Sequence, residues 1–241
     1  MKFLKGLLIT IGALVVIIVL VLGYLGFVPG VSNLFGSNKP KNLGVTYTQA
    51  DYDSAHLKDG TTHTIIPSSS SPQGSIIFSG SHPVNTVYTQ AEINALFNDR
   101  EWEYYPLKNV QIRINADNTE EISGTVLTSR LKGYAEALNL VGNNQDAIDK
   151  YLNLIPGNPA FYAKGTVEVE NGQIVNTDIT DFKIGNLTVT KQVQDNLQSI
   201  INQAYTEMAA YPGFEMTTLQ FSNGEVQFVG ALPDSARVIA K

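Results

Sequence analysis

The longest apolar run of the chain extends from Leu7 to Val28 and contains no charged residue. Its 22 residues would form a helix of about 33 Å, enough to cross a hydrocarbon core of about 30 Å. A cleavable signal peptide has a shorter apolar region, of about 7–15 residues, and ends in a small-x-small site. The stretch GYLGFVPG offers no convincing site of that kind. The pattern therefore predicts an uncleaved transmembrane anchor; a cleaved signal peptide and a buried core helix are the alternatives.

The positive charges beside this run predict its orientation. Lys2 and Lys5 precede it, whereas the first positive charges after it are Lys39 and Lys41. Positive charge next to a membrane span tends to remain cytoplasmic. The stretch after the run is rich in Gly, Ser, Asn and Pro, which is typical of a linker. We therefore expect a single-pass protein of the cell membrane with a cytoplasmic stub at 1–6, an anchor at 7–28, a linker at 29–43 and an extracytoplasmic domain at 44–241.

Two nearly identical stretches, YTQAD and YTQAE, lie 41 positions apart. In the first, Thr48 is followed three residues later by Asp51, and in the second, Thr89 is followed by Glu92. This spacing is that of the capping box, in which the two side chains bond the free amides at a helix start. The sequences that follow the motifs differ, so we interpret them as two helix starts, with a distant duplication as the alternative.

Three later segments alternate between apolar and polar residues on either side of a turn, which indicates β-hairpins. Two of the turns are Asn171-Gly172 and Asn223-Gly224, and Asn-Gly is the strongest short hairpin signal. The predicted hairpins are 109–128, 160–190 and 214–233. Other patterns predict a Ser/Pro loop at 61–73, a short strand at 74–80, and helices at 130–142 and 144–157. Hairpins without regular strand–helix alternation favour an α+β fold with a curved antiparallel sheet.

The longest helix expected after the anchor covers residues 191–210. One face of it carries a continuous apolar stripe, formed by Val193, Leu197, Ile200, Ile201, Ala204, Tyr205 and Met208. The stripe either covers the sheet or, if the sheet is strongly curved, forms one wall of an apolar groove. Trp102 and Tyr104 could line the mouth of such a groove, or pack at the edge of the core as aromatic residues commonly do.

Composition excludes several classes of function. The chain has no cysteine, and therefore no disulfide, thiolate metal site or cysteine nucleophile. Without Lys2 and Lys5 it carries 14 basic and 22 acidic residues, a net charge of −8. An exported domain of this charge lacks the basic surface that nucleic-acid binding requires.

Candidate chemical motifs are few. Ser129 and Lys132 match Ser-x-x-Lys, but the companion motifs are absent, and we interpret them as a helix N-cap and an exposed lysine. The separations between His56, His63 and His82 fit no common ligand spacing, so we expect loop histidines, no metal site and no cofactor. The acidic residues of the first hairpin, Asp117, Glu120 and Glu121, lack the order of a calcium loop and indicate an acidic turn. The chain is therefore not expected to be an enzyme; a hydrolase that uses a pair of carboxylates is the alternative.

The order of elements between Tyr88 and Pro233 carries a family resemblance. A helix start with INALFN is followed by NVQIRINADNTEEISGTV, then by FYAKGTVEVENGQIV, a long helix and LQFSNGEVQFVGALP. This order resembles a group of bacterial membrane-anchored envelope proteins. Their layout is similar to that of tubular lipid-binding (TULIP-like) domains, in which a long helix packs in a curved antiparallel sheet.

These observations lead to two hypotheses for function. In the first, the domain is non-catalytic and binds a lipid or another apolar envelope molecule beside the stripe of the 191–210 helix. In the second, it is a scaffold that binds another protein of the cell envelope. The expected partners are accordingly the membrane, a lipid ligand and an envelope protein.

Overall fold

The computed structural model describes most of the chain beyond residue 30 and part of the segment before it. The described residues are 16–17, 19–26, 28, 30–68, 71–138, 157–192, 194, 202, 205–206 and 211–241. Among them, no helix is both long and apolar enough to cross a membrane. Half of the predicted anchor, including all of 7–15, lies outside the described residues, and the anchor stays a prediction.

The domain is α+β and is built on a strongly curled antiparallel sheet, which confirms the predicted fold class. Within the described residues, the sheet has eight strands, six of which follow the order β3-β10-β9-β6-β5-β4, while β7 pairs with β6 and β8. The strands are β3 (His82–Thr89), β4 (Leu107–Ile114), β5 (Glu120–Val126), β6 (Ala160–Glu170), β7 (Gln173–Ile184), β8 (Leu187–Thr188), β9 (Glu215–Ser222) and β10 (Glu225–Leu232).

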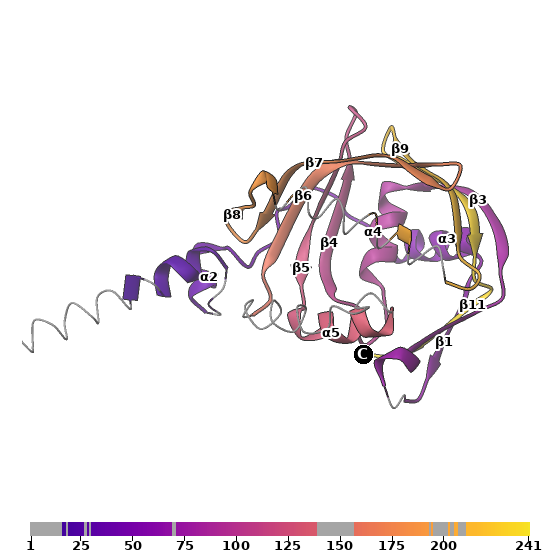
Figure 1. The fold of residues 1–241 in the computed structure, drawn as a ribbon, viewed down its shortest axis with the longest axis horizontal. Helices are drawn as coiled ribbons and strands as arrows, with labels where there is room; N and C mark the ends of the chain where they lie inside the picture. Colours follow the sequence, from indigo (N-terminus) through magenta and orange to yellow (C-terminus); the bar gives the residue numbers. More distant parts are fainter. Residues whose placement is uncertain are drawn as a thin grey trace, which may run out of the picture.

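The long β6–β7 hairpin joins the two halves of this sheet. The first part of β6 pairs with β5, whereas Val169 near its end pairs with Leu219 of β9. The β4–β5 pair therefore joins one end of this hairpin, and the β9–β10–β3 group joins its other end. Together these strands form a half-barrel (Figure 1). The turn of this hairpin places Asn171 and Gly172 at φ values of 51° and 73°, as a type I′ turn requires. All three predicted hairpins are present.

Two helices pack within or beside the curled sheet. They are α3 (Gln49–Asp59) and α4 (Gln90–Asn98), and both begin with the predicted capping box. Thr48 and Thr89 accept from the N3 amides, while Asp51 and Glu92 accept from the N-cap amides. Helix α4 lies between the two groups of strands (Figure 1). The main core cluster brings α3 and α4 together with the sheet and consists of Ala55, Val84, Tyr88, Leu96, Ile114, Val226 and Phe228.

A smaller sheet, of which the sequence predicted only the short strand at 74–80, covers one end of the domain. Its order is β1-β11-β2, formed by β1 (Thr62–Ile66), β11 (Ser235–Ile239) and β2 (Ile76–Ser79). Strand β1 runs parallel to β11, so the prediction of a loop throughout 61–73 is wrong. A short 3₁₀ helix (Pro72–Gly74) lies between β1 and β2.

Several predicted boundaries also change. The helix expected at 130–142 is α5 (Thr128–Ala137), and its N-cap is Leu127 rather than Ser129. The helix expected at 144–157 lies outside the described residues except for its last position. Of the helix expected at 191–210, the described residues up to 206 are helical, but most of the element lies outside them. The expected linker contains a short helix, α2 (Val31–Phe35).

Candidate functional site

The predicted groove residues on the 191–210 helix are mostly outside the described part of the chain. This applies to Val193, Leu197, Ile200, Ile201, Ala204 and Met208. Tyr205 is described, and its hydroxyl donates to the carbonyl oxygen of Met216 at 3.1 Å. Met216 belongs to β9 and packs against the main core cluster, so Tyr205 lies beside β9.

Trp102 and Tyr104, the other predicted groove residues, lie in a second cluster. Trp102 is 6 % exposed and packs with Ala137 of α5 and Val238 of β11. Its indole Nε1 donates to Ser75 Oγ at 3.0 Å, and Tyr104 meets it edge-on at a centroid distance of 6.4 Å. The structure therefore places these two aromatic residues in packing between α5 and the small sheet, and does not bring them to Tyr205.

The inner face of the half-barrel carries a row of apolar residues across four strands. Pairing aligns Ile112 of β4 with Ile122 of β5, Ile122 with Ala163 of β6, and Ala163 with Phe182 of β7. Directly paired residues project to the same side of a sheet. The neighbouring Ile114 belongs to the core between α4 and the sheet, which identifies this side as the inner one. Ile112 is buried, whereas the other three are only partly buried.

A carboxyl group stands beside this row. Glu120 pairs with Ile114 on one side and with Gly165 on the other, so its side chain shares the inner face. Desolvation raises the pKa of Glu120 to about 7, and the charges of Glu168 and Asp117 act in the same direction. Glu120 is therefore a group that changes charge near neutral pH in apolar surroundings.

The outer face of the same strands carries a buried ionic network, formed by Lys41, Arg113, Glu121 and Tyr162. The Glu121 side chain is 4 % exposed; its Oε1 accepts from Lys41 Nζ at 2.9 Å and from the Tyr162 hydroxyl, and its Oε2 accepts from Arg113. Burial alone would raise the pKa of Glu121, but these hydrogen bonds outweigh it and hold the pKa at about 2. Because Lys41 belongs to the expected linker, its ion pair with Glu121 holds that segment against the sheet.

The free edge of β4 is closed by side chains of α4. Asn94 Nδ2 donates to the Ile112 carbonyl, and Asn94 Oδ1 accepts from the Ile112 amide, both at 2.8 Å. One turn later, Asn98 forms the same pair with Val110 at 2.7 and 2.9 Å. These carboxamides occupy the place of a neighbouring strand.

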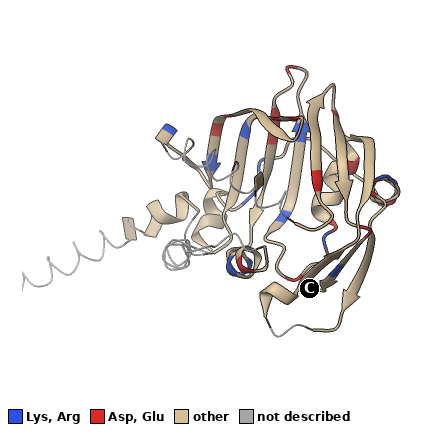
Figure 2. Cartoon of the chain, turned by 45° about the vertical axis from the view of Figure 1, so that its right-hand side comes forward, with Lys and Arg blue, Asp and Glu red and all other residues tan. Residues whose placement is uncertain are grey.

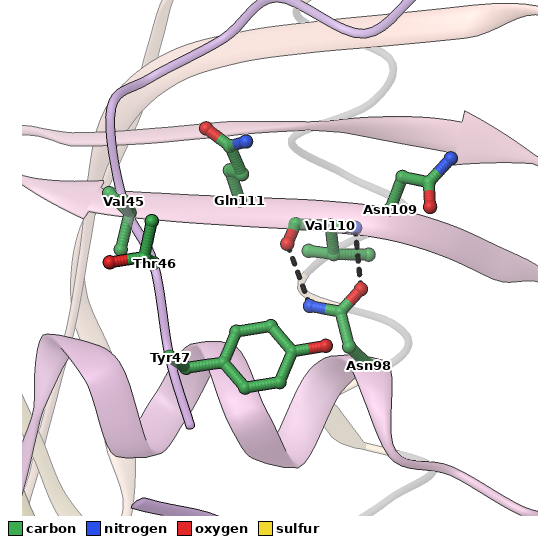
Figure 3. Close-up of a pocket in the computed structure, with 7 residues that line it drawn as sticks. All are labelled: Val45, Thr46, Tyr47, Asn98, Asn109, Val110 and Gln111. Atoms are coloured by element: carbon green, nitrogen blue, oxygen red, sulfur yellow. Dashed lines mark hydrogen bonds between the residues drawn. The ribbon is translucent and has the colours of Figure 1, made fainter. Parts of the chain in front are cut away.

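An open pocket of ≈ 430 Å³ lies along this edge (Figure 3). Asn109, with a φ of 52°, stands where the pairing of β4 with β5 shifts between Lys108 and Gln111. The pocket is lined by Val45, Thr46, Tyr47, Asn98, Asn109, Val110 and Gln111. None of these side chains is charged, and Asn98 is already paired with Val110 (Figure 3). The pocket can donate hydrogen bonds to a small neutral molecule and accept them from it, and Tyr47 is the one titratable side chain among its lining residues.

A second open hollow, of ≈ 300 Å³, lies between the β6–β7 turn and the 191–210 helix. It is lined by Gly172, Gln173, Ile174, Asn202, Tyr205 and Thr206. Ile174 and the Tyr205 ring give it apolar surface beside the amides. Sequence analysis predicted only Tyr205 of these residues as part of a site.

The three histidines are on regular elements, so their prediction as loop residues is wrong. His56 is on α3, His63 on β1 and His82 on β3. Two of them meet Asp59, because one ligand atom from each of His56, Asp59 and His63 lies within 4.8 Å of the others. We name this group the His–Asp–His cluster. The spacing rule missed it because the chain reverses at Gly60, between the helix and the strand.

The remaining candidate motifs have structural roles among the described residues. Lys132 Nζ lies 4.0 Å from Glu136 Oε1, one turn along α5. Asp117 accepts from the Thr119 amide and hydroxyl in the β4–β5 turn, which lowers its pKa. Glu120 and Glu121 face opposite sides of β5, so the three carboxylates do not converge.

Charge is distributed over the domain without segregation. Figure 2 shows Lys and Arg interspersed with Asp and Glu along the strands. No protein-family model matches this chain, and neither a curated protein nor a solved structure matches it.

Proposed function

We propose that this chain is a membrane-tethered, non-catalytic binding domain whose half-barrel holds an apolar molecule, such as an acyl chain of an envelope lipid. The observation that carries the proposal is the change in burial along the inner row. Ile112, beside α4, is 7 % exposed, whereas Ile122, Ala163 and Phe182 are only partly buried. Helix α4 thus fills one side of the half-barrel, and the side under β5, β6 and β7 retains apolar surface that a guest can cover.

The shape of this surface suits a chain-like ligand. Phe161 and Ile184 pair with each other next to Ala163 and Phe182, and both are partly buried. The apolar surface therefore extends along the β6–β7 hairpin. Burial of one methylene group contributes about 0.8 kcal/mol, so about a dozen methylenes would supply about 10 kcal/mol before the cost of association. Such a ligand needs few polar contacts.

The 191–210 helix is the second wall in this proposal. Its predicted apolar stripe would face the sheet, and the bond from Tyr205 to Met216 holds one of its turns against β9. The resemblance to tubular lipid-binding domains supports the same arrangement, in which a long helix and a curved sheet enclose the ligand.

The N-terminal segment would keep the domain at a membrane surface. Its described part presents exposed apolar side chains, with Val16, Ile17 and Val21 at 57, 56 and 52 % exposure. Apolar side chains of this exposure are stable in lipid and unfavourable in water. The Lys41–Glu121 contact then fixes where the tether joins the domain, which limits the positions that the half-barrel can take above the membrane.

Lipid retention by matched variants tests the proposal. The full chain is extracted from membranes into lipid nanodiscs, and the nanodiscs are washed. The protein is then transferred to detergent, and the lipid that stays bound to it is quantified by mass spectrometry. Ala163→Glu places a charge on the inner row, and Phe182→Ala removes apolar contact from the same row. The control, Val87→Glu, introduces the same charge at an outer position of β3 that is 42 % exposed.

We expect the parent chain and Val87→Glu to retain lipid in equal amounts, with a loss of about tenfold in Ala163→Glu and a smaller loss in Phe182→Ala. Thermal unfolding shows whether each variant is folded. Equal retention by all four folded proteins would contradict binding on the inner face.

A scaffold role is the second candidate, and one observation favours it. Among the described residues, the outer edge of β7 pairs only with β8, through Lys183 and Ile184. An edge strand of this kind can add a strand from a partner protein. Since the chain has no cysteine, a single Asp178→Cys variant can report on contacts of this edge by disulfide formation with cysteine-containing neighbours in membranes. A defined protein adduct, with no lipid retained by the parent chain, would replace the lipid proposal with this one.

A further inference from the structure

We propose that the His–Asp–His cluster is a binding site for a divalent transition-metal ion of the zinc class. Two imidazole nitrogens and one carboxylate oxygen are a donor set typical of zinc. His56, Asp59 and His63 supply one donor atom each, and all three atoms lie within 4.8 Å of one another. The site is separate from the inner face of the half-barrel and does not depend on the proposed lipid.

Local backbone structure explains why these residues converge. His56 and Asp59 are three positions apart in the last turn of α3, so they share one face of the helix. Gly60 then adopts the left-handed conformation at φ 68° and ends the helix. The reversal directs the chain into β1, where His63 returns beside His56 with a ring-centroid distance of 4.6 Å and an interplanar angle of 72°.

One of the donor distances is close to that of a tetrahedral site. With metal–ligand distances of about 2.0–2.1 Å, neighbouring donors of a tetrahedral zinc ion lie about 3.3 Å apart. His56 Nδ1 and Asp59 Oδ2 are 3.1 Å apart, so two of the ligands already have this separation. His63 is an exposed residue, and rotation of its side chain can bring its nitrogen nearer to the other two.

Both carboxylate oxygens of Asp59 have a partner, and a metal ion would replace the proton shared between Asp59 Oδ2 and His56. Asp59 Oδ1 accepts from the Thr61 amide at 2.9 Å, while Oδ2 faces His56. The Asp59 carbonyl oxygen is bonded to His82 Nε2 at 2.8 Å, which fixes the backbone at the same residue. Supporting bonds of this kind orient the ligands in many metal sites.

Electrostatics at the cluster favour a cation on balance. Asp59 contributes a full negative charge, and the carbonyl end of α3 contributes partial negative charge. Although His63 is exposed as a residue, desolvation of its ring lowers its pKa, and the neighbouring His56 lowers it further. A lowered pKa favours the neutral imidazole, which is the form that binds a metal ion. The positive charge of Arg100 lowers the pKa of His63, whereas Asp59 raises it. The same positive charge would weaken the binding of a metal cation.

Three protein ligands leave a fourth position for water or another donor. The chain offers little alternative, since it has three histidines and no cysteine in total. His82 is occupied by the Asp59 carbonyl and by Asp234 Oδ1 at 3.0 Å. Any strong zinc site made of nitrogen or sulfur ligands should therefore involve the cluster.

Metal titration of the full chain tests the proposal. The protein is stripped with a chelator in detergent micelles and titrated with Zn²⁺ by calorimetry, and in parallel with Co²⁺, whose visible absorption reports the coordination geometry. We expect one Zn²⁺ per chain and a Co²⁺ spectrum of tetrahedral or five-coordinate type. His56→Ala and His63→Ala each remove a direct ligand, so each should weaken Zn²⁺ binding by at least the roughly 10–100-fold typical of a lost outer-shell partner and remove the Co²⁺ bands.

The matched control is Asp53→Asn, an exposed acid on the same helix that contacts only Gln49 among the described bonds. It should bind Zn²⁺ as the parent chain does. His63→Gln is a second variant that keeps a polar side chain on β1 if His63→Ala fails to fold. Absence of stoichiometric binding to the folded parent chain, or equal weakening by Asp53→Asn and His63→Gln, would overturn the proposal.

Discussion

The carboxamide of Asn94 pairs with both backbone groups of Ile112, at 2.8 Å for each bond. A backbone amide and carbonyl at the edge of a sheet are normally satisfied by water or by another strand. Here the strand is replaced by a helix side chain that is 1 % exposed. Asn98 repeats the arrangement with Val110, so α4 both fills one side of the half-barrel and closes its β4 edge.

Replacement of Asn94 by alanine should destabilise the fold strongly. The Ile112 amide and carbonyl would lose their partners in a buried position, and each unsatisfied group costs about 1–3 kcal/mol. We expect Asn94→Ala to lower the free energy of unfolding by about 3 kcal/mol. The emission of Trp102, the single tryptophan of the chain, reports the transition because this residue is buried in the folded state. Asn85→Ala, at an exposed position of β3, should change stability by less than about 0.5 kcal/mol; an equal effect of the two variants would argue against edge closure by Asn94.

The outer-face network should make stability depend on pH below 4.5. Its hydrogen bonds lower the pKa of Glu121 from 4.5 to about 2. A carboxyl with a lowered pKa contributes stability that is present above pH 4.5 and is lost as the pH falls toward 2. Lys41 and Arg113 have side chains that are 49 and 41 % exposed, so solvent screens the pairs. We expect Glu121→Gln to cost about 2 kcal/mol at pH 7 and to flatten the acid limb of the unfolding curve, whereas Glu225→Gln, an exposed control on β10, should do neither.

Glu120 should have the opposite dependence on pH. Its pKa is raised from 4.5 to about 7, so the folded chain binds more protons than the unfolded chain between these values. The contribution of Glu120 to stability therefore falls as the pH rises from 4.5 to 7. Because the carboxyl is only partly buried, we expect a change of about 1–2 kcal/mol. The free energies of unfolding of the parent chain and of Glu120→Gln are measured across this pH range. The variant should become steadily more stable relative to the parent as the pH rises. A constant difference would contradict the placement of Glu120 in apolar surroundings.

The close approach of β6 and β7 should not tolerate a side chain at Gly165. A Cβ atom there would overlap the backbone oxygen of Asp178, and the backbone must move to avoid it. Overpacking of this kind typically costs about 1–3 kcal/mol. Gly165→Ala should lower the midpoint of thermal unfolding by several degrees. Thr166→Ala, at the next residue on the same strand, is the control and should have a smaller effect. A Gly165→Ala protein as stable as this control would show that β6 and β7 can move apart without loss of stability.

The features that sequence analysis predicted are those encoded within a few residues. The capping boxes at Thr48 and Thr89 need only a side chain and an amide three positions away. The Asn171-Gly172 turn needs two residues that accept positive φ. Alternation then assigns the strands on either side, and the α+β class follows from the hairpins.

The features that it missed depend on contacts between distant residues. Strand β1 was predicted as part of a loop because Thr62–Ile66 leads directly into a Ser/Pro-rich stretch, and its pairing with β11 joins residues more than 170 positions apart. Asn94 and Asn98 read as ordinary polar residues of a helix until β4 lies beside them. His56 and His63 are seven positions apart, which matches no ligand spacing on a continuous helix but becomes a contact once Gly60 ends α3.

Mapping of photoreactive lipid contacts tests the central claim most directly. A lipid with a diazirine in its acyl chain is supplied to membranes that contain the full chain. The membranes are irradiated, and the labelled residues are identified by peptide mass spectrometry. The account predicts labels on the inner face of β5–β7, including Phe161 and Phe182, which Ala163→Glu abolishes and Val87→Glu leaves unchanged. Labels confined to the apolar N-terminal segment, with none on the half-barrel, would contradict it.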